Sequence, residues 1–414
     1  MPKARLSDLP ADTLRGATVL VRLDLNVPLD DGVVSDDTRI DATLPTLRHL
    51  SESGARVVVT SHLGRPEGAD PSFSLEPVAA VLARKLGRAI AFVPETVGDR
   101  ATAAIAALGE GDILLLENTR FHDEETANDP DFAAALAEGM DLFVQDAFGT
   151  VHRAHASTEG AARVLRKRGC PVVAGYLLEE ELRWLGDALE SPEQPFVAIL
   201  GGAKISGKID VVSALLPRVD KLLIGGAMAN TFWLAQGHDV GTSLVEPDRV
   251  DVAREVMAAA GDRLVLPVDA RVATALDGSA TPRVTRPEEI ADDEAIGDIG
   301  PETEALYASL IAGARTVVWN GPAGIFEQPA FAEGTLAIAR AIASATDAGA
   351  VTILGGGDSA RAAVQAGVTD RLTHVSTGGG ASLSFLAGEA LPGVEVLSEA
   401  DALRTDAHRA EVGA

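Results

Sequence analysis

The sequence predicts an α/β fold: two doubly wound, Rossmann-like parallel-sheet domains joined by a hinge helix. A chain of 414 residues exceeds the roughly 100–200 residues of one domain, so two domains are expected. Short β-branched runs recur at intervals long enough to hold a helix, which is the pattern of βαβ units. Runs such as residues 113–116 (ILLL) do not alternate with polar residues, as expected for strands buried on both faces of a parallel sheet.

Six strands are predicted in each half of the chain. In the first half they are Thr18–Asp24, Arg56–Ser61, Ala89–Val93, Asp112–Leu116, Leu142–Gln145 and Pro171–Ala174. In the second half they are Phe196–Leu200, Lys221–Ile224, Arg263–Leu266, Arg315–Trp319, Val351–Leu354 and His374–Ser376. Helical patterns lie between them, for example Leu44, Leu47 and Leu50 at three-residue spacing before Gly54.

The boundary between the two halves is predicted at a charged helix. Residues 179–185 have a helical pattern, and the turn-rich residues 191–195 end it before the next strand. We therefore expect an N-terminal domain over residues 1–175, a hinge helix and linker over 176–195, and a C-terminal domain over 196–396. Two domains joined in this way are able to move relative to each other.

Charge and cysteine content exclude several kinds of function. The net charge is −26, from 35 basic and 61 acidic residues, which disfavours binding to nucleic acid or to an anionic membrane. Cys170 is the single cysteine, so an internal disulfide and a zinc cluster are excluded and a reducing compartment is expected. No apolar run approaches the ~18 residues of a membrane-spanning helix. We expect a cytoplasmic protein without nucleic-acid or membrane partners.

Cationic side chains follow the predicted strands of the first half. Arg39, Arg65, Arg120, Arg153 and His62 all lie in segments that follow these strands. Ligands of an open parallel sheet bind at the carboxyl ends of its strands, and the fork of arginine suits carboxylate and phosphate oxygens. Pairing with a surface carboxylate is the simpler explanation for any one arginine. Four of them in consecutive segments predict a pocket for a small polyanion.

Glycines follow the strands of the second half. They are Gly201-Gly202, Gly225-Gly226, Asn320-Gly321-Pro322-Ala323-Gly324, Gly355-Gly356-Gly357-Asp358-Ser359 and Gly378-Gly379-Gly380. Glycine lets backbone N–H groups approach phosphate oxygens, and a following helix adds its positive N-terminal end. One such pair is ordinary turn chemistry. Five in one half of the chain predict a phosphate or nucleotide site.

Two lysines and two carboxylates accompany these glycines. Lys204 and Lys208 are two of only six lysines, but Ile209 stands where a P-loop has its Mg²⁺-binding Ser or Thr, so a phosphate site of a different build is expected. Asp358 is placed either to hold Mg²⁺ or to cap the next helix. Glu327 is either an acceptor for a ribose hydroxyl or a solvated loop residue.

Together these segments resemble the phosphoglycerate kinase family over nearly the whole chain. The substrate-side motifs are Arg22–Pro28, with Leu25 where Phe is usual, then Ser61–Pro66, Glu117–His122 and Asp146–His155. The nucleotide-side motifs are Ile199–Lys208, Gly225–Phe232, Leu266–Asp269, Asp298–Thr303, Trp319–Glu327, Gly355–Ser359 and His374–Gly388. Two departures are Ser359, which replaces the usual Thr and keeps the hydroxyl, and Gly207, which stands where a larger residue is frequent.

The resemblance implies reversible phosphoryl transfer from ATP to the carboxylate of 3-phosphoglycerate, which gives ADP and 1,3-bisphosphoglycerate. It implies that phosphoglycerate is held by Asp24, Asn26, Arg39, His62, Arg65, Arg120 and Arg153. It implies that Mg-ATP is held by Lys204, Glu327, Gly356, Gly357, Asp358 and Ser359, with Lys208, Gly321 and Ala323 nearby and Mg²⁺ on Asp358. It also implies a monomer whose C-terminal segment, residues 397–414, joins the N-terminal domain.

The expected chemistry needs no general base, because a carboxylate and an ADP phosphate are already ionised near neutral pH. We assign stabilisation of the transferring group to Arg39, Lys204, the Gly379 amide and Mg²⁺, with the two domains closing around the hinge. Two alternatives remain: a kinase for another small carboxylate, which would not need so many cations, and a non-catalytic sensor of a phosphorylated ligand.

Overall fold

The computed structural model describes residues 3–401, which form two compact units. Unit 1 comprises residues up to Leu182 together with the segment from Ala390, and unit 2 runs from Arg183 to Glu389. The division falls inside helix α7 (Tyr176–Glu190), in the stretch expected to form the hinge helix. The chain returns to unit 1 at Ala390, and residues 402–414 of the expected C-terminal segment lie outside the described residues.

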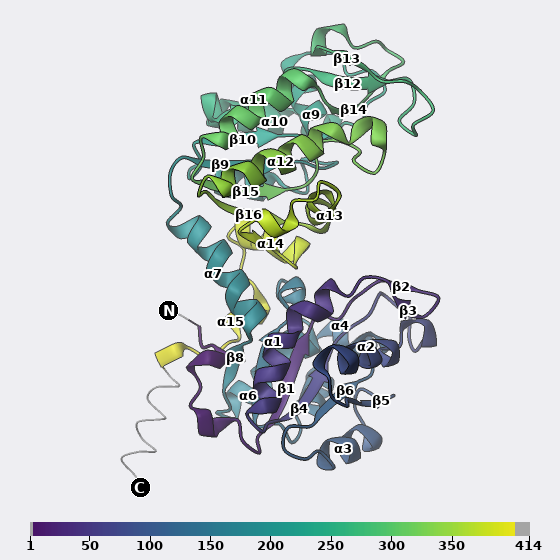
Figure 1. Cartoon of the computed structure of the whole chain (residues 1–414), viewed down its shortest axis with the longest axis vertical. Helices are drawn as coiled ribbons and strands as arrows, with labels where there is room; N and C mark the ends of the chain where they lie inside the picture. The colour runs from purple at the N-terminus through teal and green to yellow at the C-terminus, as the bar shows by residue number, and fades with distance from the viewer. Residues whose placement is uncertain (1–2, 402–414) are drawn as a thin grey trace. The chain divides into compact units, whose positions relative to one another are not determined.

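Unit 1 is built on a six-stranded parallel sheet with strand order β5-β6-β4-β1-β7-β8 (Figure 1). The strands are β1 (Thr18–Leu23), β4 (Arg56–Thr60), β5 (Ala91–Val93), β6 (Ile113–Leu116), β7 (Leu142–Asp146) and β8 (Val172–Ala174). The connections run to one side of β1 and then to the other, so right-handed crossovers place helices on both faces. The helices are α1 (Thr38–Glu52), α2 (Glu76–Leu86), α3 (Asp99–Ala106), α4 (Asp123–Ala127), α5 (Pro130–Leu136), α6 (Ala161–Lys167), the first part of α7, and α15 (Pro392–Glu395).

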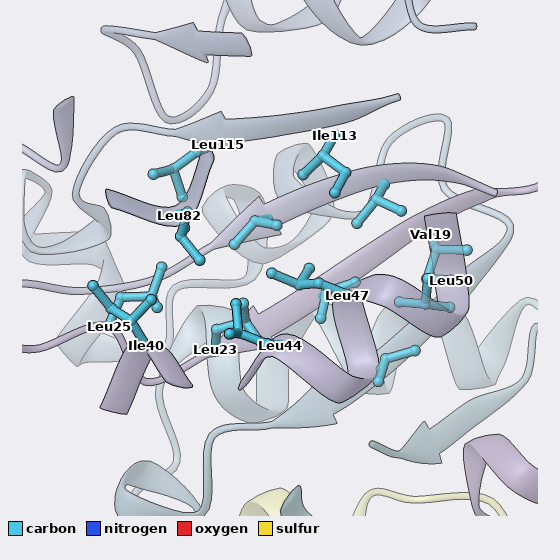
Figure 2. Packing of buried hydrophobic residues seen from close by; sticks show 14 of the residues in the cluster. Val19, Leu23, Leu25, Ile40, Leu44, Leu47, Leu50, Leu82, Ile113 and Leu115 are labelled. Carbon is cyan, nitrogen blue, oxygen red and sulfur yellow. The ribbon is translucent and has the colours of Figure 1, made fainter. Parts of the chain in front are cut away.

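The core of unit 1 lies between this sheet and its helices. Leu44, Leu47 and Leu50 of α1 point toward the sheet, as their spacing predicts, and pack in one cluster with Val19 and Ile113 (Figure 2). All of these side chains are buried. The packing holds the strands in register, so their carboxyl ends form one edge from which the polar loops emerge.

Unit 2 has a second six-stranded parallel sheet with order β11-β10-β9-β15-β16-β17. Its strands are β9 (Phe196–Leu200), β10 (Lys221–Ile224), β11 (Leu264–Val265), β15 (Thr316–Asn320), β16 (Val351–Gly355) and β17 (His374–Val375). Its helices are α8 (Ile209–Leu215), α9 (Met228–Gln236), α10 (Val250–Ala260), α11 (Pro301–Ala312), α12 (Glu333–Asp347), α13 (Gly357–Gln365) and α14 (Gly379–Leu386). Strand order reverses between β9 and β15, and the crevice at such a switch point is where open α/β sheets bind ligands.

The predicted fold class is confirmed, and the strands of both parallel sheets lie where the sequence predicts them, with ends shifted by one or two residues. Two smaller sheets were not predicted. One is an antiparallel sheet of β12 (Ala270–Ala273), β13 (Arg283–Thr285) and β14 (Ala295–Ile299), and the other pairs β2 (Leu29–Asp30) with β3 (Val33–Val34). Across residues 3–401, each helix is too short or too polar to cross a bilayer.

Candidate active site

Unit 1 has a cationic cavity of about 400 Å³ formed by the loops that follow its strands. Arg65 follows β4, Arg120 lies in the 3-10 turn Thr119–Phe121 after β6, and Arg153 follows the turn Phe148–Thr150 after β7. The structure therefore brings three of the four predicted arginines together. A cavity of this size accommodates a small polyanion.

The charges in this cavity are close enough to disfavour one another. Burial, and then the charges of Arg153, Arg22 and Arg65, lower the pKa of Arg120. Burial and the neighbouring arginines also lower the pKa of His155 to about 4, so this ring is neutral at pH 7. An anion bound here would relieve the repulsion among the guanidinium groups, which favours phosphate as a ligand.

Arg39 is held beside the cavity rather than in its lining. It lies in the first turn of α1, and its Nη1 donates to Asp24 Oδ1 and Oδ2 at 3.1 Å and to the Asn26 carbonyl at 3.1 Å. Asn26 Oδ1 in turn accepts from the Gly64 N–H at 2.8 Å. The predicted residues Asp24, Asn26 and Arg39 thus form one hydrogen-bonded cluster at the carboxyl ends of β1 and β4.

His62 follows β4 and is buried. Its Nδ1 lies 3.1 Å from Nη2 of Arg22, a side chain that is only 1% exposed. Burial, and then the charges of Arg22, Arg120 and Arg39, lower the pKa of His62 well below its usual value, so the ring is neutral. Sequence reasoning did not single out Arg22. The available signal was an arginine inside a strand that is otherwise apolar.

In unit 2, Lys208 lies at the switch point between β9 and β15. Its Nζ donates to the Gly201 carbonyl at 2.5 Å, to the Asn320 carbonyl at 2.9 Å and to Asn320 Oδ1 at 2.7 Å. Burial lowers the pKa of Lys208 to about 8, against the opposing charge of Asp358. Asn320 was not among the predicted site residues. Its Nδ2 is buried, and no hydrogen-bond acceptor among the described residues faces it.

The glycine loops of unit 2 approach one another closely. A Cβ on Gly321, whose φ is +92°, would lie 2.4 Å from the Gly201 carbonyl oxygen, so only glycine fits there. The Gly321 N–H donates to Ser359 Oγ at 2.6 Å, and Gly379 lies against the backbone of Gly356. Helices α13 and α14 therefore begin side by side, and their N-terminal amides are positioned to bind phosphate oxygens.

The remaining predicted residues of unit 2 lie around this cradle. Ala323 is buried, and its N–H donates to Thr335 Oγ1 at 3.0 Å. Lys204 is exposed in the loop between β9 and α8. Asp358 and Glu327 are both exposed and share Arg361, at 2.7 Å and 3.3 Å respectively.

The donor groups fit a magnesium ion that is bound mainly by a nucleotide. Asp358 is the second residue of α13, behind Gly356 at the N-cap, so the interpretation of Asp358 as the cap is wrong. Within residues 3–401, three or more His, Cys, Asp or Glu side chains do not gather into a metal cage. Mg²⁺ typically takes one or two carboxylates and completes its shell with water and substrate phosphates. One exposed carboxylate beside a glycine-lined cradle suits that arrangement.

Comparison with known proteins agrees with this geometry. The phosphoglycerate kinase family model matches residues 7–389. A phosphoglycerate kinase of Synechococcus sp. (strain JA-3-3Ab) is 51% identical over 401 residues, and the match covers 94% of this chain and 96% of the relative. A phosphoglycerate kinase of Chlorobium luteolum is 49% identical over 403 residues, and the match covers 96% of this chain and 100% of the relative.

Solved structures give the same result. The phosphoglycerate kinase of Coxiella burnetii superposes with a TM-score of 0.85 at 42% identity, covering 95% of this chain and 98% of the other. That of Pyrococcus horikoshii OT3 gives 0.82 at 34% identity, covering 97% and 99%. The family predicted from the motifs is confirmed: this chain belongs to the phosphoglycerate kinase family.

Proposed function

We propose that this protein catalyses the reversible transfer of a phosphoryl group between ATP and the carboxylate of 3-phosphoglycerate. The observation that carries the proposal is the cavity of unit 1, where Arg65, Arg120 and Arg153 converge. A substrate without a phosphate of its own would leave these guanidinium groups repelling one another. This unrelieved repulsion disfavours a kinase for an unphosphorylated carboxylate.

In unit 1, the three arginines of the cavity would bind the phosphate of 3-phosphoglycerate. Asp24, Asn26, Arg39 and His62 would bind the rest of the molecule. Because Asp24 already fixes the guanidinium of Arg39, that group is oriented before the substrate arrives. Preorientation lowers the entropy lost on binding.

In unit 2, the cradle formed by Gly321, Gly356, Gly357, Ser359 and Gly379 would hold the nucleotide phosphates. Ala323 lies in its wall, Lys204 and Lys208 supply positive charge, and Glu327 would accept from the ribose. Asp358 would hold Mg²⁺, which when bound supplies positive charge that stabilises the phosphoryl group during transfer. For Asp358 and Glu327 to act in this way, each must exchange its contact with Arg361 for the ligand.

The two sites are in different units, and α7 connects the units. Transfer in line between them therefore requires the units to close, which also excludes water and prevents hydrolysis. X-ray scattering should show a smaller radius of gyration with both substrates than with either alone. An unchanged radius would contradict closure.

The direct test is ADP release from Mg-ATP with and without 3-phosphoglycerate, with hydroxylamine present to trap the acyl phosphate. We expect turnover that needs 3-phosphoglycerate and yields a hydroxamate. ADP release without hydroxamate would indicate another acceptor. Nucleotide binding without turnover would favour a non-catalytic sensor of a phosphorylated ligand.

We further propose that the protein acts as a monomer in the cytoplasm, in keeping with a net charge of −26 that disfavours polyanionic partners.

A further inference from the structure

A chain of four buried polar side chains lies near the cationic cavity of unit 1, because the charges of two of its members act on Arg120 in the cavity lining. The chain joins segments far apart in the sequence. Glu125 lies in α4, Ser157 in the π-helical turn Ala156–Gly160, Arg22 in β1, and His62 after β4. Glu125 and Ser157 are fully buried, and Arg22 and His62 are at most 4% exposed. The expected set of binding residues contains His62 but none of the other three.

The hydrogen bonds of this chain have a defined direction. The Ser157 hydroxyl donates to Glu125 Oε1 at 2.6 Å, and the Ser157 N–H donates to Oε2 at 2.9 Å. With its one proton used in this way, the hydroxyl oxygen accepts from Arg22 Nε at 2.8 Å. Nη1 of Arg22 donates to the Leu23 carbonyl, and Nη2 faces His62 Nδ1 at 3.1 Å. Three nitrogens of the guanidinium are therefore anchored.

This direction determines the state of the histidine ring. A guanidinium has only donors, so His62 Nδ1 must accept from it. A neutral imidazole carries one proton, which must then be on Nε2. Burial and four arginines keep the ring neutral, because they lower the pKa of His62 well below its usual value. The ring is thus a donor at Nε2 and never an acceptor there.

We propose that Glu125, Ser157 and Arg22 are positioning residues that hold His62 in its Nε2–H tautomer, so that it donates to an oxygen of the bound phosphoglycerate. The inference rests on the proposed function for the identity of that ligand. A neutral donor adds a directed hydrogen bond to the ligand without adding a further cation to the three arginines that line the cavity.

If Glu125 and Ser157 served only to stabilise the buried Arg22, different contacts would be expected. Arg22 would then need only a buried counter-charge, and a direct ion pair with Glu125 would provide it. Instead Ser157 stands between the two, and the third side of the guanidinium is directed at a ring nitrogen. Through these contacts the Glu125 carboxylate fixes the orientation of Ser157, Ser157 fixes that of Arg22, and Arg22 fixes that of the His62 ring. The tautomer of the His62 ring therefore tests the arrangement directly.

The first measurement is the ring ¹⁵N–¹H multiple-bond spectrum of histidine-labelled wild-type protein at pH 7, with His62→Gln used only to assign the His62 signals. We expect the Nε2–H pattern with and without 3-phosphoglycerate. A ring protonated at Nδ1, or at both nitrogens, would overturn the proposal. Because this readout needs no turnover, it stands or falls separately from the proposed function: a fixed Nε2–H tautomer in a protein that fails to use 3-phosphoglycerate would refute only the latter.

The second measurement compares Ser157→Ala with Ser51→Ala. Ser51 is also buried in unit 1 and donates to the Gly111 carbonyl at 2.6 Å, so its loss removes a similar bond outside the chain of four. For Ser157→Ala we expect a mixture of His62 tautomers and a KM for 3-phosphoglycerate raised roughly tenfold, with the KM for Mg-ATP unchanged. Ser51→Ala should change neither the tautomer nor this KM. A His62 spectrum that stays the same in folded Ser157→Ala would overturn the assigned role of Ser157 and Glu125.

Discussion

Asp146 makes the stability of unit 1 depend on pH. It ends β7 with no exposed surface, and its Oδ1 accepts from the Leu178 N–H in the first turn of α7 at 3.0 Å. Its Oδ2 is buried without a partner. Burial raises the pKa of Asp146 from 3.8 to about 7, although the nearby Thr46 hydroxyl and the N–H groups at the start of α7 oppose the rise. Between about pH 4 and pH 7, the folded protein therefore keeps a proton on Asp146 that the unfolded chain releases.

The size and sign of the effect follow from this pKa. A carboxyl group whose folded pKa is raised contributes stability that is fully present below about pH 4, decreases as pH rises, and is lost above about pH 7. At about 1.4 kcal/mol per pKa unit, the rise corresponds to about 4 kcal/mol. Asp146→Asn keeps the shape and the acceptor for Leu178 but does not ionise. The variant should therefore gain up to about 4 kcal/mol relative to wild type between pH 4 and pH 8.

The assay is urea unfolding of both proteins across this pH range, followed by circular dichroism and by hydrogen exchange of β1 and β7. Hydrogen exchange is needed because the three tryptophans, Trp184, Trp233 and Trp319, all lie in unit 2, so no tryptophan lies within unit 1 to report on it directly. Asp131→Asn, at an exposed position of α5, is the control and should follow wild type. Wild-type and Asp146→Asn curves that run parallel at every pH would refute the reasoning.

Three further predictions concern unit 2. Lys204→Ala should lower kcat by roughly 10²–10³ with a smaller change in KM, and an unchanged kcat with a raised KM for Mg-ATP would make Lys204 a binding residue only. Asp358→Asn should raise the Mg²⁺ concentration for half-maximal activity by about tenfold or more, and a superimposable Mg²⁺ titration would contradict its assignment. Gly321→Ala should lower the free energy of unfolding of unit 2 by about 1–3 kcal/mol or more and abolish nucleotide binding, because the φ of Gly321 is +92° and the Gly201 carbonyl oxygen would clash with a Cβ. A variant whose unfolding curve, followed by tryptophan fluorescence, matches that of wild type would contradict this prediction.

The parallel sheets could be predicted because their strands are buried on both faces and are therefore apolar throughout. The antiparallel sheet of unit 2 could not. Its strand Arg283–Thr285 has only Thr285 buried, and its pairing with Ala270–Ala273 is a tertiary choice that leaves no periodic signal. The return of the chain at Ala390 likewise depends on contacts with Val172 and Ala4 that local sequence does not encode.

The candidate site was predictable where topology alone places residues. Arg65, Arg120 and Arg153 follow strands, and the rule that ligands bind at strand ends brings them together. Asn320 and Ser157 were missed because no local sequence pattern marks either residue. Each matters through one long-range contact, Asn320 with Lys208 and Ser157 with Arg22, across 112 and 135 positions of the chain.

The discontinuous course of unit 1 has a consequence for how the protein is made. Ser398 accepts from the Ala4 N–H and donates its own N–H to the Val172 carbonyl, at 2.8 Å each, so the last described segment completes the edge at β8. A ribosome releases residues in order, so all of unit 2, residues 183–389, emerges before these contacts can form. The N-terminal sheet therefore keeps one edge incomplete while more than 200 further residues are synthesised, whereas unit 2 is a single uninterrupted stretch of the chain.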